Sequence, residues 1–172
     1  MLKILGAALI LLASTLAGWW KASGYAARPH EIRRLILALR RMETEIGYGF
    51  TPLPEAFSRI GAQNREPLRS LFIEAAEAMG PPRNWTAQDS LHHAIRERWK
   101  YSYMKAGERD VMYQLAFSLG TSDRKDQLNH LETAIRQLET EEAVALEEQR
   151  RYEKMCRSLG LLAGAFIVIL IY

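Results

Sequence analysis

The sequence predicts an all-α protein: a bundle of about six helices that ends in one long helix, with an apolar helix at each end of the chain. Three observations predict this fold. Apolar residues recur every three or four positions along the centre of the chain, which is the spacing of one helix face. No segment shows the two-residue alternation of a strand. Both ends of the chain, 4–20 and 159–172, are nearly uninterrupted apolar runs.

The N-terminal run, 4–20, has 17 residues and lies at the short end of the range for a membrane-spanning helix. A secretory signal peptide is the alternative, because Lys3 precedes the run and small residues stand at Ala13 and Ala17. The run is longer than a typical signal-peptide core, a tryptophan pair ends it, and a basic segment follows. We therefore expect an N-terminal transmembrane helix.

The C-terminal run, 159–172, is short, since 14 residues of helix rise only about 21 Å. We expect Met155 and Cys156 to enter the membrane with it, while the side chain of Arg157 reaches back to the headgroups. A buried helix in a soluble core is the alternative, but the run has no polar face. The predicted parts are an N-terminal transmembrane helix at 1–20, a helical domain at 21–157 and a C-terminal transmembrane helix at 158–172.

Basic residues flank both apolar runs on the side of the central domain, whereas Lys3 is the only basic side chain beyond them. The positive-inside rule then places the domain in the cytoplasm. The single cysteine, Cys156, excludes an intrachain disulfide and suits a reducing compartment. The net charge of +3 is too small to indicate a partner.

Start and stop residues divide the central domain into six helices. Proline is tolerated in the first turn of a helix, and glycine often follows the last turn. The predicted starts are Arg28-Pro29, Thr51-Pro52, Pro67, a capping box at Thr86–Asp89, about Glu108, and a cap at Ser122 with Asp123. The predicted stops are Gly47 with Gly49, Gly80, and Gly120.

Each predicted helix carries one apolar stripe, and the stripes together define the expected core. Its members are Ile32, Leu35, Ile36, Leu39, Met42, Ile46, Leu53, Ala56, Phe57, Ile60, Leu68, Leu71, Phe72, Ala75, Met79, Leu91, Ala94, Ile95, Trp99, Val111, Met112, Leu115, Ala116, Leu128, Leu131, Ile135 and Leu138. Beyond Leu138 the stripe thins to Ala145, Tyr152 and Cys156. That half of the long helix is expected to be solvated or to have another partner.

Two segments have opposite charge. Residues 21–41 hold six basic side chains and one acidic one, and residues 132–148 hold six acidic side chains and one basic one. Counting from the two apolar ends predicts antiparallel helices. The expected neighbours are Arg33 and Arg34 with Glu147 and Glu148, and Arg40 and Arg41 with Glu141 and Glu142. The alternative is two solvated faces, with the arginines on lipid headgroups.

No motif for catalysis, a cofactor or a metal is found, and no enzyme is expected. The adjacent His92 and His93 diverge by about 100° on a helix and cannot share one metal ion. Ser122 and Asp123 have no histidine assigned to them and serve as well as helix caps. No phosphate-binding loop is present. Nucleic acid is not an expected partner either, since acidic residues interrupt the basic helix and no aromatic platform accompanies it.

The turn 47–54 is the predicted partner-binding site. Two prolines and two glycines make it rigid and exposed, while Tyr48, Phe50 and Leu53 supply apolar contacts. The alternative is that these side chains fold back into the bundle. The candidate residues are Arg40, Arg41, Glu45, Tyr48, Phe50, Pro52 and Leu53.

Four blocks of the chain carry a resemblance to a known family. They read MLKILG at 1–6, LRRMETEIGYGFTPLPEAF at 39–57, LGTSDRKDQLNHLE at 119–132 and EKMCRSLGLLAG at 153–164. With these blocks the sequence resembles the stage III sporulation protein AB family of spore-forming bacteria, over essentially its whole length. The segment 80–107 is less distinctive.

The resemblance implies a membrane component of the complex built between the mother cell and the engulfed forespore, on the mother cell side of the outer forespore membrane. It implies a cytoplasmic helical bundle similar to the cytoplasmic domains of type II secretion platform proteins, and a secretion-type ATPase, sporulation protein AA, as partner. The expected function is a non-enzymatic scaffold that couples this ATPase to an export channel. The alternative is a secreted, tail-anchored helical adaptor whose first segment is cleaved.

Overall fold

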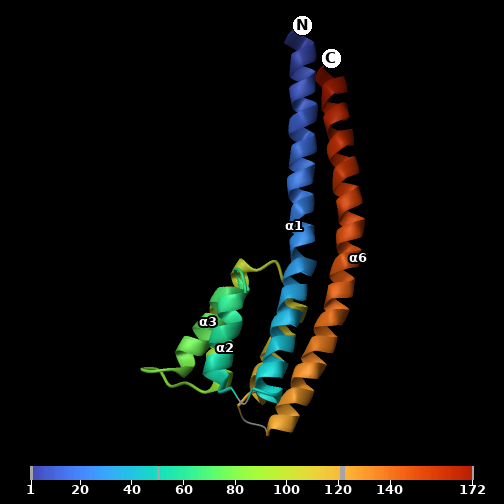
Figure 1. The fold of residues 1–172 in the computed structure, drawn as a ribbon. Coiled ribbons are helices and arrows are strands. Elements are labelled where there is room, and N and C mark those ends of the chain that lie inside the picture. Colours follow the sequence, from blue (N-terminus) through green and yellow to red (C-terminus); the bar gives the residue numbers. More distant parts are fainter. Residues whose placement is uncertain (1, 50, 121–122, 172) are drawn as a thin grey trace. The chain divides into compact units, whose positions relative to one another are not determined.

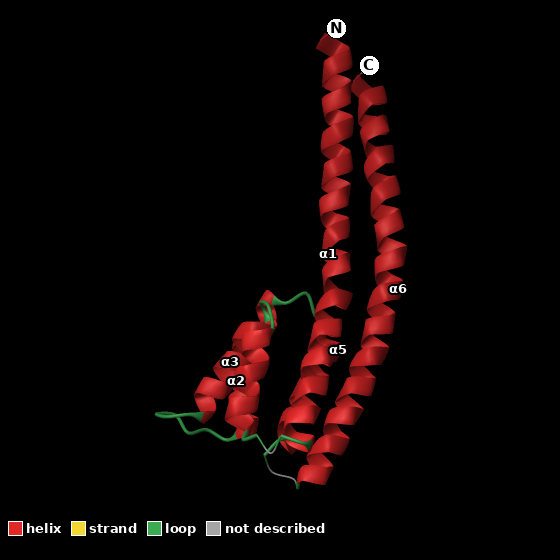
Figure 2. Ribbon diagram, viewed as in Figure 1, coloured by secondary structure: helices red, strands yellow, loops and turns green. Residues whose placement is uncertain are grey.

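The computed structural model describes residues 2–49, 51–120 and 123–171, except for most side chains before Ala26 and after Tyr152. The elements follow in the order α1 (Leu2–Gly47), α2 (Leu53–Gln63), α3 (Leu68–Met79), α4 (Ala87–Arg98), the short 3-10 helix η1 (Trp99–Tyr101), α5 (Ala106–Ser118) and α6 (Arg124–Ile171). All regular structure in these ranges is helical (Figure 2). The predicted all-α class and the long last helix are confirmed.

The chain forms two compact units, of which the first contains 1–29 and 143–172. In this unit the first part of α1 and the last part of α6 run side by side (Figure 1). The guanidinium of Arg28 donates to the carboxylate of Glu148 at 2.7 Å. No helix in the described part of the chain meets both the length and the apolarity that a membrane crossing requires.

The first helix begins earlier than predicted. α1 runs from Leu2 to Gly47 with Pro29 inside it, so the predicted start at Arg28-Pro29 is wrong. Proline lacks the N–H that bonds to the carbonyl four residues earlier and its ring crowds that carbonyl, yet α1 continues through Pro29. The preceding Ala26 and Ala27 favour the helical conformation. The segment 24–29 therefore rises as helix and not as a linker.

The second unit contains 30–142 and holds most of the predicted core. All stripe residues of α1, α4 and α5 are buried. Three predicted core residues, Leu53, Met79 and Leu128, are only half-buried, because each lies at or near an end of its helix. Burying a large aliphatic or aromatic side chain contributes about 1.5–3 kcal/mol, so these stripes account for much of the stability of the unit.

Successive helices pack on one another in this unit, α2 on α3, α3 on α4 and α4 on α5. The rings of Phe57 and Phe72 lie 5.8 Å apart between α2 and α3. Gly61 brings the two helices close, because a Cβ atom there would lie 2.8 Å from Cγ1 of Ile73 and 3.1 Å from its main-chain nitrogen. The α2–α3 contact therefore depends on a glycine at this position.

The helix starts show where the cap predictions hold. The hydroxyl of Thr86 accepts the N–H of Asp89 at 3.0 Å, which confirms the predicted cap of α4. Thr51 is not the cap of α2: Pro52 takes that position, and the Thr51 hydroxyl donates to Glu45 instead. α5 begins at Ala106, two residues before the predicted start.

At the start of α6 the carboxylate of Asp123 accepts the N–H of Asp126 at 2.8 Å. Its main-chain carbonyl accepts the N–H of Gln127 at 2.9 Å. Both bonds are those of an N-cap residue. Ser122, the other predicted cap, lies outside the described residues.

Candidate partner-binding surface

The turn after α1 is held by hydrogen bonds to the last turn of that helix. The N–H of Tyr48 donates to the carbonyl of Thr44 at 2.9 Å, and the hydroxyl of Thr51 donates to the carboxylate of Glu45 at 2.6 Å. Only glycine fits at Gly49, since a Cβ atom would lie 2.8 Å from the carbonyl oxygen of Glu45 and from Oγ1 of Thr51. These contacts restrict the turn to one backbone conformation.

The apolar residues of this turn differ in exposure. Tyr48 is 87% exposed and Pro52 is exposed. Leu53 is half-buried, and its Cδ1 atom would lie 3.7 Å from a Cβ at Gly120. Phe50 lies outside the described residues. The tyrosine is therefore presented to solvent, whereas the leucine folds partly back against the α5–α6 connection.

The three charged candidates all have partners within the chain. Arg40 donates to Glu139 on α6 at 2.6 Å, and Arg41 donates to Gln63 at the end of α2 at 2.9 Å. The carboxylate of Glu45 also accepts from Arg59 on α2, at 3.3 Å. Each of these side chains therefore helps to attach α1 to a neighbouring helix, and a role in partner binding stays a prediction.

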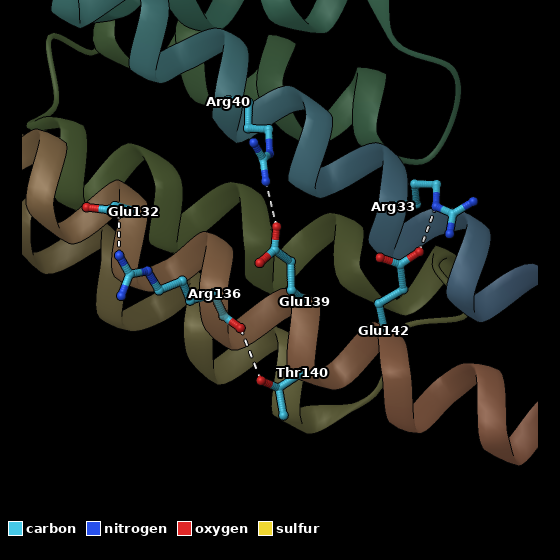
Figure 3. Close-up of polar contacts among 7 residues, drawn as sticks. All are labelled: Arg33, Arg40, Glu132, Arg136, Glu139, Thr140 and Glu142. Carbon is cyan, nitrogen blue, oxygen red and sulfur yellow. Dashed lines mark hydrogen bonds and ion pairs between the residues drawn. The ribbon is translucent and has the colours of Figure 1, made fainter.

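The predicted pairing of a basic and an acidic helix is confirmed within the second unit. Arg33 donates to Glu142 at 2.7 Å and Arg40 to Glu139 at 2.6 Å, so the two helices are antiparallel here (Figure 3). Arg136, the one base in this part of α6, pairs with Glu132 on its own helix (Figure 3). Some carboxylates of α6 thus pair with arginines of α1, and another pairs with an arginine of α6 itself.

The predicted register is wrong by about a helical turn. Arg33 pairs with Glu142 and not with Glu147 or Glu148, and Arg40 pairs with Glu139. The prediction counted from the apolar ends and assumed that both helices leave them at one level. Register is set instead by the packing of buried stripe residues, whose burial outweighs exposed ion pairs of about 0.2–1 kcal/mol each.

Two exposed aromatic residues near the turn were missed by the sequence analysis. Trp85 is 40% exposed before α4, and Phe117 is 58% exposed near the end of α5. Phe117 lies outside the apolar stripe of its helix, which was the available indication that it faces outward. Its ring meets that of His92 edge-on, with centroids 4.8 Å apart.

The connections that carry these residues meet at one end of the second unit. Gly120 has φ +84°, and a Cβ atom there would lie 3.1 Å from Cβ of Ala87. Leu53 touches the same position. The turn after α1, the start of α4 and the end of α5 therefore come together. We name five residues at this end the turn surface: the exposed Tyr48, Pro52, Trp85 and Phe117, and the half-buried Leu53.

A hollow of about 470 Å³ lies beside the turn surface and is lined by Trp85, Asp89, His92, His93, Arg96 and Tyr113. Its imidazoles are engaged with neighbours: His92 packs against two aromatic rings, and His93 lies 3.3 Å from the carboxylate of Glu74. Across 2–49, 51–120 and 123–171, no three acidic, histidine or cysteine side chains are grouped to hold a metal ion.

Comparison with known proteins places this geometry in a family. The family model of stage III sporulation protein AB matches residues 3–172. Stage III sporulation protein AB of Bacillus subtilis (strain 168) is 36% identical over 171 residues, which cover 99% of both chains. The chain belongs to the stage III sporulation protein AB family.

A solved structure of stage III sporulation protein AB has the same fold, with a TM-score of 0.68 and 32% identity. The match covers 73% of this chain and 98% of the other. In this member of the sporulation protein AB family, two of the blocks that carry the resemblance, 39–57 and 119–132, lie against each other. A Cβ atom at Gly47 would lie 3.7 Å from Cδ2 of Leu128, and Leu53 meets Gly120. The turn surface stands where these blocks meet.

Proposed function

We propose that this member of the sporulation protein AB family is a non-enzymatic membrane scaffold of a secretion-like complex, which couples a cytoplasmic ATPase to an export channel between mother cell and forespore. The observation that carries the proposal is the full-length match to a stage III sporulation family, with both apolar ends inside the matched range. A scaffold needs no catalytic group, only surfaces that hold other components.

In this proposal the apolar ends, 1–20 and 158–172, are membrane spans, and 21–157 lies in the mother cell cytoplasm at the outer forespore membrane. Their composition supports this, as do the basic residues that follow the first run and precede the second. The helical continuity of α1 and α6 into these runs adds support, because every main-chain group in lipid requires an internal hydrogen bond.

The proposed partner is a secretion-type ATPase, sporulation protein AA, and the proposed contact is the turn surface. Aromatic side chains on a rigid frame make efficient contacts, since they bury a large area and lose little conformational freedom. Tyr48 lies in a hydrogen-bonded turn, and the ring of Trp85 meets that of His93 edge-on with centroids 5.2 Å apart. The neighbouring hollow offers room for a side chain of the partner.

Binding of the full chain, in detergent, to purified ATPase tests the proposal. Tyr48→Ala is expected to weaken binding by about tenfold, as loss of a moderate interface contact does, without changing thermal stability. Arg109→Ala on α5 is the matched control, because Arg109 is exposed and lies outside the turn surface. Equal affinity of the Tyr48 variant and wild type would place the contact elsewhere, and no binding of wild type would refute the ATPase coupling.

Topology is tested separately. With Cys156→Ser as background, Ala106→Cys on the exposed start of α5 is expected to resist an impermeant thiol reagent in intact cells and to react after permeabilisation. Rapid labelling in intact cells would support the secreted adaptor instead. The mass of the mature protein then decides whether the first segment is cleaved, since an intact N-terminus excludes a removed signal peptide.

A further inference from the structure

Two tyrosines and two glutamates line a hollow of about 420 Å³ within the second unit. Its rim meets solvent, because Tyr101 is 65% exposed, Tyr103 is 57% exposed and Glu66 is exposed. Glu31 is only 7% exposed and forms part of the inner wall. We name this site the Tyr-Glu hollow, and its other lining residues are Pro67, Ser70 and Arg98.

Both carboxylates of the Tyr-Glu hollow accept main-chain N–H groups. Glu31 accepts from Tyr103 at 2.7 Å, and Glu66 accepts from Ser70 at 3.3 Å. Within the described part of the chain, no cationic side chain forms an ion pair with either glutamate. Burial raises the pKa of the Glu31 carboxyl group, and the charge of Arg34 offsets this only in part. A cation that enters the hollow would therefore meet two carboxylates whose charge is incompletely balanced.

The cationic side chains around the hollow are engaged with other groups. Arg98 donates to the carboxylate of Glu74, so the charges of these two residues balance. The ammonium of Lys100 lies 5.2 Å from the centroid of the Tyr101 ring and covers one face of it. The exposed ring of Tyr103 is therefore the aromatic surface offered to a cation from another molecule.

The connection that carries both tyrosines is ordered by its own hydrogen bonds. The indole N–H of Trp99 donates to the carbonyl of Lys105 at 3.2 Å. The hydroxyl of Ser102 donates to the carbonyl of Trp99 at 2.8 Å. A wall that is already ordered loses little conformational entropy when a ligand binds.

A guanidinium group matches the chemistry of the hollow. It is planar and has five N–H donors, so it can donate to two carboxylates while its face lies on an aromatic ring. An ammonium group is more strongly hydrated and lacks that flat face. A metal ion fits less well, because no three acidic, histidine or cysteine side chains are grouped to hold one in 2–49, 51–120 and 123–171.

We propose that the Tyr-Glu hollow binds an arginine side chain presented by an exposed segment of a partner protein, with the guanidinium between Glu31, Glu66 and Tyr103. The complementary charge of the two carboxylates favours this occupant. The hollow shares no residue with the turn surface, so the proposal does not depend on ATPase binding there. It gives the scaffold a second contact, for another component of the complex.

The full chain in detergent, labelled with 3-fluorotyrosine, is titrated with the blocked peptide Ser-Gly-Arg-Gly-Ser. The fluorine NMR signals of Tyr101 and Tyr103, assigned with phenylalanine variants, are expected to shift to saturation, while the signal of Tyr48 stays in place. A peptide with citrulline, which has nearly the shape of arginine but no charge, is expected to bind about tenfold more weakly, and a lysine peptide several-fold more weakly. An unmoved Tyr103 signal overturns the proposal, as does equal binding of the citrulline or the lysine peptide.

Charge-removing variants locate the contact. Glu31→Gln and Glu66→Gln each keep an acceptor for the main-chain N–H, and each is expected to weaken binding of the arginine peptide by about tenfold. Tyr103→Ser, followed by the Tyr101 signal, is expected to weaken it about fivefold. Glu132→Gln is the matched control, because Glu132 is exposed on α6 outside the hollow, and wild-type affinity is expected. Equal weakening by the control and by Glu66→Gln would indicate diffuse charge attraction and overturn the site.

Sedimentation of the chain without peptide tests a second copy of this chain as the occupant. Wild type and Glu66→Gln are expected to have the same distribution of species. A shift of the variant toward smaller species would mean that an arginine of a second copy fills the hollow, and it would overturn the proposal of a separate partner.

Discussion

The carboxylate of Glu31 on α1 accepts the main-chain N–H of Tyr103 at 2.7 Å, across 72 positions of the sequence. Glu31 is 7% exposed, and burial raises the pKa of its carboxyl group, while this hydrogen bond and the nearby charge of Arg34 act in the opposite direction. One acidic side chain therefore joins the first helix to the connection 100–105 between α4 and α5, and burial makes its ionised form costly.

This relationship predicts a dependence of stability on pH. Because the pKa of Glu31 is higher in the folded chain than in the unfolded one, its contribution to stability is fully present below the unfolded pKa and is lost as pH rises through the folded pKa. Glu31→Gln keeps an acceptor for the Tyr103 N–H and removes the charge. The unfolding free energy of this variant relative to wild type is expected to increase from pH 4 to pH 7.

Denaturant unfolding of the full chain in detergent at both pH values measures that difference. Glu31→Ala is the control, because it also removes the acceptor and is expected to destabilise the chain at either pH. A Glu31→Gln variant whose relative stability does not change with pH would show that burial of the charge is fully compensated.

The close approach of α2 and α3 predicts an unusual result for a glycine substitution. Alanine normally stabilises a helix interior by about 0.5–1 kcal/mol relative to glycine. Gly61→Ala is expected to destabilise the chain by about 1–3 kcal/mol instead, because the added Cβ meets the side chain and main chain of Ile73. Gly47→Ala is the control, since its Cβ would make an ordinary contact at 3.7 Å with Leu128 and is expected to be tolerated.

The N-cap of α6 predicts the effect of removing one carboxylate. Asp123→Ala takes away the acceptor of the Asp126 N–H and is expected to lower stability by about 1 kcal/mol. Asp123→Asn, which retains a cap oxygen, is expected to restore most of the loss. If both variants have the melting temperature of the wild type, another group accepts the free N–H groups in the first turn of α6.

Exchange of charges tests the pairing of α1 with α6. Arg33→Glu places a carboxylate beside Glu142, and the reversed pair Arg33→Glu, Glu142→Arg restores attraction. Arg33 is 60% exposed, so the coupling energy from the double-mutant cycle is expected to be about 0.2–1 kcal/mol. A coupling energy of zero, measured at low salt, would contradict the pairing of these two residues.

Much of this architecture could be predicted because it depends on local rules. A 3.6-residue period in apolar side chains identified the buried faces of α1, α4 and α5, and Thr86 was identified as a cap by its residue type and its position before a helical segment. Pro29 misled the prediction, because proline is typical of a first helical turn and costly inside a helix, whereas α1 continues through it. Thr51 misled it as well, because its hydroxyl found a partner in Glu45.

The candidate site was predicted only in part. The turn after α1 was identified from its glycines and prolines, and Tyr48 is exposed as expected for a contact residue. Trp85 and Phe117 were not assigned to the same surface, because they stand far from the turn in sequence. Their proximity arises from the return of the chain through α4 and α5, which brings Ala87 and Gly120 together.

The sequence by itself determined the helical class, the apolar faces, the two apolar ends and the opposite charges of 21–41 and 132–148, since each of these follows from residue type and spacing along one segment. Only the tertiary structure decided that Arg33 meets Glu142, that Leu53 turns toward Gly120 and that Glu31 accepts the N–H of Tyr103. These contacts join segments far apart in the chain. Their register is set by how buried side chains of different helices fit together, which no single segment encodes.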